Sequence, residues 1–198
     1  MKLFHSPASP YVRKVMVLAL ETGQSVEKLA SMASPIAADQ SIVKENPTGK
    51  VPTAILDDGE PLYDSRVITR WLDAQHNGAK MYPENDTVWT VLRREALADG
   101  LLDAALLARY ETAMRPAELL WQDWLDGQMG KINASLDRME AETADFSGID
   151  AGLIAIGCAI AYLDFRFADF DWRSSRPALT KWYETFAARP SMVDTAPE

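Results

Sequence analysis

The feature that most constrains the fold is a loop ending in proline, followed directly by a short hairpin. The loop is the segment Asn46-Pro47-Thr48-Gly49-Lys50-Val51-Pro52. After it, residues 53–56 are predicted to form a strand and residues 61–63 the return strand. Residues 57–60, Asp-Asp-Gly-Glu, are a strong turn signal because Asp and Gly both tolerate positive φ. The segment therefore predicts a β-turn-β unit entered through a proline.

The two ends of this unit could together hold a small anionic peptide. A cis Val51-Pro52 bond, which is essentially a proline option, would turn the Val51 main chain away from the sheet. Its N–H and C=O could then pair with an extended ligand, as in strand addition. Asp64 and Ser65 precede the next helical period, and amides at a helix start favour a carboxylate. The alternative is an ordinary β-turn-β-helix with a proline edge and a serine cap.

At these residues the sequence resembles the glutathione S-transferase family. Asn-Pro-x-Gly-Lys-Val-Pro, a hairpin and Asp-Ser at a helix start follow in the family's order. The opening segments Met1-Lys2-Leu3-Phe4 and Ser6-Pro7-Ala8-Ser9-Pro10-Tyr11-Val12-Arg13-Lys14-Val15 are similar to the first strand and helix of bacterial members. The resemblance implies an α/β thioredoxin-like N-terminal domain, an all-α C-terminal helical bundle, a homodimer and glutathione bound at the domain cleft.

The organisation of the chain agrees with this resemblance. Residues 1–77 are expected to form the thioredoxin-like, glutathione-binding domain, residues 78–86 the linker and residues 87–198 the all-helical domain. Within the first domain we expect strands at 2–4 and 26–30, and helices at 10–22, 35–44 and about 67–76. In the second we expect helices at about 87–113, 117–142, 149–163 and 178–188. Ser147-x-x-Asp150 is predicted to be a capping-box variant at the start of the third of these.

Family chemistry requires a group that activates the glutathione thiol, since the thiolate is the nucleophile. A hydroxyl at a helix N-terminus favours the thiolate through a hydrogen bond and the helix dipole. Ser9 before Pro10 is a good helix start, and we favour it. Ser6 before Pro7 is the rival, and both serines could simply cap and turn the chain. No Tyr stands at the end of the first strand and no Cys at residues 6–10, unlike the tyrosine- and cysteine-type classes.

The resemblance also implies the remaining glutathione contacts. Val51, next to Pro52, should pair with the cysteinyl main chain. Asp64 should attract the γ-glutamyl ammonium and Ser65 the γ-glutamyl carboxylate. Lys50 is a candidate for the glycyl carboxylate, although a solvated lysine is an equal alternative.

The first long helix carries the other family expectations. Asp99 is a candidate contact to the partner subunit's glutathione, or else a solvated helix residue. Tyr110, Arg109 and Leu106 are candidates for the pocket of the second substrate. Trp121 and Trp124 are expected in the core or in dimer packing.

Composition excludes several other classes of function. The net charge of −9 disfavours binding to nucleic acid, because an acidic protein repels the phosphate backbone. Residues 1–77 are nearly neutral, with 8 basic and 9 acidic side chains, which is consistent with an anionic peptide held there. The apolar stretch 149–163 is too short to span a membrane, and no segment resembles a signal peptide. The single Cys158 excludes an internal disulfide and favours the reducing cytoplasm. Two distant histidines predict no metal cluster.

The sequence therefore predicts a serine-type glutathione transferase that adds the thiolate to an electrophilic small molecule. The alternatives are a glutathione-binding or regulatory protein of the same fold that does not catalyse, and a glutathione-dependent reductase or isomerase.

Overall fold

The computed structural model describes residues 1–197, and contacts within it divide the chain into two compact units. Unit 1 comprises Met1–Val88 together with the residues from Arg189 onward, and unit 2 is Trp89–Ala188. The sequence-based division assigned the residues after 188 to the helical domain. Their contacts place them in unit 1 instead, because they pack on a helix of that unit.

Unit 1 contains a four-stranded sheet with the order β2-β1-β3-β4. Its strands are β1 (Lys2–His5), β2 (Glu27–Ala30), β3 (Thr53–Ile55) and β4 (Pro61–Leu62). β1 runs parallel to β2 and antiparallel to β3, so Leu3 lies opposite both Lys28 and Ala54. Leu3 and Ala54 are fully buried and lie in the core of the unit. The predicted hairpin is confirmed, with Gly59 at φ 92° in its turn.

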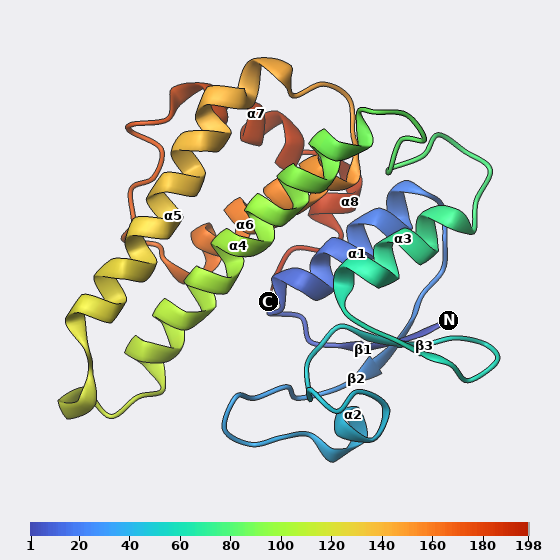
Figure 1. The fold of residues 1–198 in the computed structure, drawn as a ribbon, viewed down its shortest axis with the longest axis horizontal. Helices are drawn as coiled ribbons and strands as arrows, with labels where there is room; N and C mark the ends of the chain where they lie inside the picture. The colour runs from blue at the N-terminus through green and yellow to red at the C-terminus, as the bar shows by residue number, and fades with distance from the viewer. Residues whose placement is uncertain (198) are drawn as a thin grey trace. The chain divides into compact units, whose positions relative to one another are not determined.

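The helices of unit 1 pack around this sheet. They are α1 (Pro10–Glu21), α2 (Gln40–Glu45), α3 (Ser65–Ala74) and α8 (Pro190–Val193). α1 packs against α3 and α8, while α2 lies on the other side of the strands (Figure 1). The start and the end of α1 agree closely with those predicted from the sequence. Ser9 is the N-cap of α1, Pro10 is its first residue, and Gly23 follows its end at φ 70°.

The helix expected at residues 35–44 begins five residues later than predicted. α2 starts at Gln40, with Asp39 as its N-cap accepting a hydrogen bond from the Ser41 N–H at 2.9 Å. Before it, the Ser34 hydroxyl accepts hydrogen bonds from the N–H groups of Ile36 and Ala37. Such local side-chain bonds compete with helical ones, which explains the delayed start.

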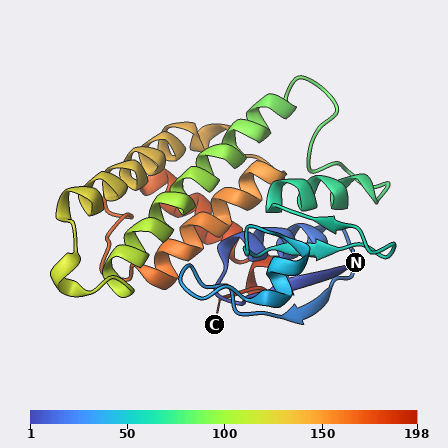
Figure 2. The same ribbon diagram turned by 60° about the horizontal axis from the view of Figure 1, so that its bottom comes forward.

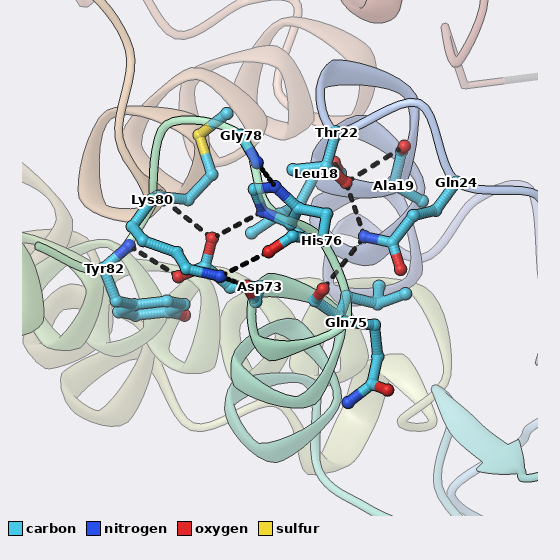
Figure 3. A network of polar contacts seen from close by, with 12 residues as sticks. Leu18, Ala19, Thr22, Gln24, Asp73, Gln75, His76, Gly78, Lys80 and Tyr82 are labelled. Atoms are coloured by element: carbon cyan, nitrogen blue, oxygen red, sulfur yellow. Dashed lines mark hydrogen bonds and ion pairs between the residues drawn. The ribbon is translucent and has the colours of Figure 1, made fainter.

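A buried carboxylate at the end of α3 orders the segment expected to be a linker (Figure 3). Asp73 accepts hydrogen bonds from the N–H groups of Met81 at 2.7 Å and Tyr82 at 3.0 Å, and pairs with His76. The Lys80 ammonium donates to the carbonyls of Asp73 and His76. A hollow of about 280 Å³ lies beside this network, but the Asp73 carboxylate and the Lys80 ammonium are already engaged within the protein.

Unit 2 is helical, as predicted (Figure 2). Its elements are α4 (Val88–Ala113), η1 (Ala117–Leu119), α5 (Gln122–Glu142), η2 (Thr143–Asp145), α6 (Ala151–Arg166) and α7 (Pro177–Ala187). α4 and α5 form an antiparallel pair. Arg93 near the start of α4 bonds to Glu142 at the end of α5 at 2.6 and 2.8 Å. At the opposite end, Glu111 accepts a hydrogen bond from the Trp121 N–H at 2.9 Å.

The buried helix α6 starts at a different cap from the one expected. Its N-cap is Asp150, whose carboxylate accepts a hydrogen bond from the Leu153 N–H at 2.8 Å. The predicted capping box placed Ser147 at the cap, which is wrong, and Ser147 is exposed. Burial raises the pKa of Asp150, against the opposing effects of the Leu153 N–H and Arg94. A Cβ at Gly152 would lie 2.7 Å from the Val91 carbonyl oxygen, so α4 and α6 approach closely only because this residue is glycine.

The tryptophans after α4 are not in the core. Trp121 is 62% and Trp124 39% exposed, and their rings stack at 6.3 Å between centroids. The core interpretation is therefore wrong. Of the helices within residues 1–197, none is both long and apolar enough to cross a membrane.

Replacing Glu142 by Gln should destabilise unit 2, because Glu142 bonds to Arg93 of α4 and to Arg138 within α5. At neutral pH the expected loss is about 1.5–3 kcal/mol, the range for hydrogen bonds to charged groups. The Arg93 hydrogen bond lowers the pKa of Glu142. Its contribution is therefore complete above the usual carboxyl pKa and disappears as pH falls through the lowered value.

Urea unfolding at neutral and acid pH measures this difference. The wild-type and Glu142→Gln midpoints should converge in acid. Glu118→Gln, at an exposed position of η1, is the control and should leave the midpoint unchanged at both pH values.

Candidate functional site

The loop between α2 and β3 is organised by one buried amide. Asn46 is 2% exposed, and its Nδ2 donates to the Lys50 carbonyl at 3.3 Å and to the Thr53 hydroxyl at 2.9 Å. Its Oδ1 accepts hydrogen bonds from the N–H and hydroxyl of Thr48 at 3.0 and 2.8 Å. The Thr53 hydroxyl donates to the same Lys50 carbonyl at 2.8 Å. These bonds fix the course of the chain immediately before Val51.

The Val51-Pro52 peptide bond is cis, as expected from the sequence. Pro52 and Thr53 are buried, whereas Val51 lies in a bend before β3 and is half-buried. Among the hydrogen bonds formed by residues 1–197, none involves the Val51 N–H or C=O. The main chain of this residue therefore keeps both polar groups for an external partner. The Lys50 side chain is exposed beside it.

Asp64 and Ser65 stand at the start of α3 in the same unit. Asp64 is the N-cap, and its Oδ1 accepts a hydrogen bond from the Arg66 N–H at 3.0 Å. Its side chain is 59% exposed, so the carboxylate can also meet a ligand. Ser65 is 2% exposed, and its carbonyl accepts a hydrogen bond from the Thr69 hydroxyl. The Tyr63-Asp64 peptide is also cis, which the sequence did not predict.

The two candidate serines flank the turn that leads from β1 into α1. The Ser9 N–H donates to the Ser6 carbonyl at 3.0 Å. The Ser9 hydroxyl accepts a hydrogen bond from the Val12 N–H at 3.3 Å, which leaves its own hydrogen available to a ligand. Both serines are half-buried. His5 precedes them, and burial, with Lys28, lowers its pKa, which favours a neutral imidazole there.

Asp99 is only 2% exposed on α4, which excludes the solvated helix position. The contact with the ligand of a partner subunit stays a prediction.

The second-substrate candidates lie in unit 2. Tyr110, Arg109 and Leu106 are half-buried on α4. Burial raises the pKa of Tyr110, and it also raises that of Tyr162 on α6, with a further contribution from Tyr110. Tyr162 is 5% exposed and lies in the core, as the apolar run around it predicted.

Among residues 1–197, no group of three or more His, Cys, Asp or Glu side chains is placed to hold a metal ion. The one cysteine, Cys158, is buried in α6.

The fold and the site define a class: a thioredoxin-like unit with a cis-proline loop, joined to a helical unit. Comparisons with known proteins assign the family. A profile described as "Glutathione S-transferase, N-terminal domain" matches residues 3–80, and "Glutathione S-transferase, C-terminal domain" matches residues 122–185. The chain belongs to the glutathione S-transferase family.

Two relatives span nearly the whole chain, and one of them has been solved with two different ligands. The uncharacterized GST-like protein YibF of Escherichia coli (strain K12) is 37% identical, over 100% of this chain and 98% of its own. A glutathione transferase family member from Pseudomonas fluorescens Pf-5, solved with bound glutathione, is 48% identical with a TM-score of 0.96; the match covers 100% of this chain and 98% of that one. A structure from the same organism with bound S-(propanoic acid)-glutathione has 48% identity, a TM-score of 0.93 and the same coverage.

The Asn46 amide can be tested by Asn46→Ala, which leaves the Lys50 carbonyl and the Thr53 hydroxyl with fewer partners. We expect a loss of about 1–3 kcal/mol, the cost of unsatisfied buried groups. Hydrogen exchange of the Thr48 and Gly49 amides, which both bond to Asn46, should become faster. Asn85→Ala is the matched control, since Asn85 accepts the same two bonds from Thr87 at an exposed turn. Equal losses of stability in Asn46→Ala and Asn85→Ala would contradict the role of the Asn46 amide in organising the loop.

Proposed function

We propose that this protein is a glutathione transferase of the serine type, which binds glutathione on unit 1 and adds the thiolate of glutathione to an electrophilic small molecule. The observation that carries the proposal is the Val51 main chain, unpaired beside cis Pro52, in the same unit as the helix start at Ser65. Family membership supports it, as do the relatives solved with bound glutathione. The bound S-(propanoic acid)-glutathione of one relative supports chemistry at sulfur, because its substituent is carried there.

In the proposed complex the tripeptide lies extended along the loop. The Val51 N–H and C=O pair with the cysteinyl main chain, as an added strand would. Asp64 attracts the γ-glutamyl ammonium, and the hydroxyl and amide of Ser65 receive the γ-glutamyl carboxylate. The ammonium of the exposed Lys50 forms an ion pair with the glycyl carboxylate. Each charged group of the ligand thus faces an oppositely charged group or a hydrogen-bond donor of the protein.

The proposed chemistry is ionisation of the thiol followed by attack of the sulfur. The thiol proton passes to solvent, and the thiolate is stabilised by a hydrogen bond from Ser9 and by the amides at the start of α1. The sulfur then forms a bond to the electrophilic carbon. The displaced group leaves with its electron pair, or, on addition to a double bond, the neighbouring carbon takes up a proton. Ser6, whose carbonyl already bonds the Ser9 N–H, is the rival for the hydroxyl role.

Binding without catalysis is the main alternative, and it predicts a different pH behaviour. A binding or regulatory protein of this fold would hold glutathione with its thiol pKa unchanged. A glutathione-dependent reductase or isomerase would share the lowered thiol pKa and differ in the second substrate. A homodimer and a cytoplasmic location are proposed from the family resemblance and from the single buried Cys158.

Ser65→Ala should weaken glutathione binding about tenfold or more, since it removes a hydrogen bond to a charged group. Isothermal titration calorimetry at neutral pH measures the dissociation constant. Ser147→Ala, at an exposed serine outside the site, is the control and should bind as the wild type does. Unchanged binding by Ser65→Ala would remove this residue from the site.

Ser9→Gly should raise the pKa of the bound thiol by about one unit or more, with little change in affinity for glutathione. Glycine keeps the cap within a few tenths of a kcal/mol, so α1 should stay folded. The pH dependence of thiolate absorbance and of turnover with chlorodinitrobenzene measures the shift. Ser6→Gly is the comparison. A shift with Ser6→Gly alone would transfer the role to Ser6, and wild-type binding with an unshifted thiol pKa would favour the binding-only alternative.

A further inference from the structure

The residues after Ala188 return to unit 1 and lie along α1. We call residues 189–197 the C-terminal segment; it includes α8 (Figure 1). Met192 is 1% and Ser191 5% exposed, so the segment is partly built into the core of the unit. α1 is the helix whose first turn carries Ser9. The C-terminal segment and the proposed thiol-activating group therefore share one helix.

Arg13 connects the C-terminal segment directly to the first turn of α1. It lies in the first turns of α1 and is 8% exposed. Its main-chain N–H donates to the Ser9 carbonyl at 3.0 Å. Its Nη2 donates to the Met192 carbonyl at 2.7 Å, and its Nε donates to the Thr195 hydroxyl at 3.3 Å. The Thr195 hydroxyl in turn donates to the Ser191 carbonyl at 2.7 Å. Arg13 thus joins the chain around Ser9, through its own main chain, to two points of the C-terminal segment, through its guanidinium.

The far end of α1 is held by the same segment. Arg189 donates to both carboxylate oxygens of Glu21, at 2.9 and 2.8 Å, and the Ser191 hydroxyl donates to Glu21 as well. The Arg189 hydrogen bond lowers the pKa of Glu21, so this carboxylate stays ionised in its pair. Because the segment bonds to α1 near both ends, it constrains the position of the helix along its axis as well as its tilt.

Burying an arginine side chain carries a large desolvation free energy. A buried charge is tolerated only where it is paired or hydrogen-bonded, and an apolar side chain of similar size would pack without that requirement. What the guanidinium adds is direction, since its planar fork fixes the main chain of the C-terminal segment relative to the first turn of α1.

We infer that Arg13 is a positioning residue for the thiol-activating end of α1, held in place by the C-terminal segment. The inference rests on the proposed function. Ser9 and the first amides of α1 act on the sulfur through a hydrogen bond and the helix dipole, and both fall off over short distances. A displacement of about 1 Å in such a group can cost much of its effect. Glutathione binding itself depends on Val51 and Ser65, which these bonds do not reach.

The test is Arg13→Met, which keeps the bulk of the side chain and removes its donors. The pKa of the bound glutathione thiol should rise, so that the thiolate fraction at neutral pH falls about three- to tenfold, while the dissociation constant changes less than about twofold. Arg13→Lys keeps the positive charge on a single nitrogen but loses the planar fork, and it should give an intermediate pH profile. Arg173→Met is the matched control, because Arg173 pairs bidentately with Asp164 within unit 2, and its profile should match the wild type.

A pH profile of Arg13→Met that superimposes on the wild type would overturn the inference. Should Arg13→Met fail to fold, Thr195→Val removes the bond to the Arg13 Nε together with the bond to the Ser191 carbonyl, and it keeps the bond from Nη2 to the Met192 carbonyl. A smaller shift in the same direction supports the role, and no shift refutes it. Failure of the proposed function is recognised separately, as wild-type protein that does not bind glutathione. In that case hydrogen exchange of the first-turn amides of α1 decides, with faster exchange in Thr195→Val supporting the positioning role and unchanged exchange refuting it.

Discussion

The buried side-chain amide of Asn46 is the interaction on which the candidate site depends. An unpaired amide in the interior is costly, so the surrounding chain must supply partners, and it does so by folding back between Thr48 and Thr53. That closure sets where the chain enters β3 and leaves the Val51 main chain without an internal partner. A site that reads a ligand's main chain needs such an edge, because a strand paired on both sides has nothing left to offer. The side chains that stabilise the loop are thus different from the Val51 main-chain groups that the loop presents to a ligand.

Much of this could be predicted from the sequence because the signals are local. The Asp-Gly turn, the Ser9-Pro10 helix start and the Gly23 stop each depend on the conformations that single residue types permit, and the structure confirms them. The cis bond before Pro52 was expected from the thioredoxin-like pattern, at a residue type that permits it, and it is confirmed. The positions of Val51 and Ser65 in one unit follow from the short hairpin between them. Their roles toward glutathione stay predictions, since they concern a ligand rather than the chain.

What could not be predicted depends on packing between distant segments. Asp150 caps α6 in place of Ser147 because the cap is chosen where the helix meets its neighbours, and Gly152 shows how close that meeting is. The late start of α2 depends on Ser34, whose competing hydrogen bonds a periodicity count ignores. The stacked, exposed pair of Trp121 and Trp124 looked like core because size and apolarity do not reveal which face of a helix is covered. Asp73 gave no signal at all, although it orders the whole segment after α3.

The return of the C-terminal segment to unit 1 makes unit 2 an insertion within the sequence of unit 1. During synthesis the sheet, α1 and α3 are all made before any of unit 2, yet α1 lacks the partners of Arg13 and Glu21 until the chain has been made past Thr195. The first unit therefore completes its packing last, after about a hundred intervening residues have had time to fold as a separate body. A ribosome-bound chain stopped short of that point would carry the proposed site with its helix incompletely anchored.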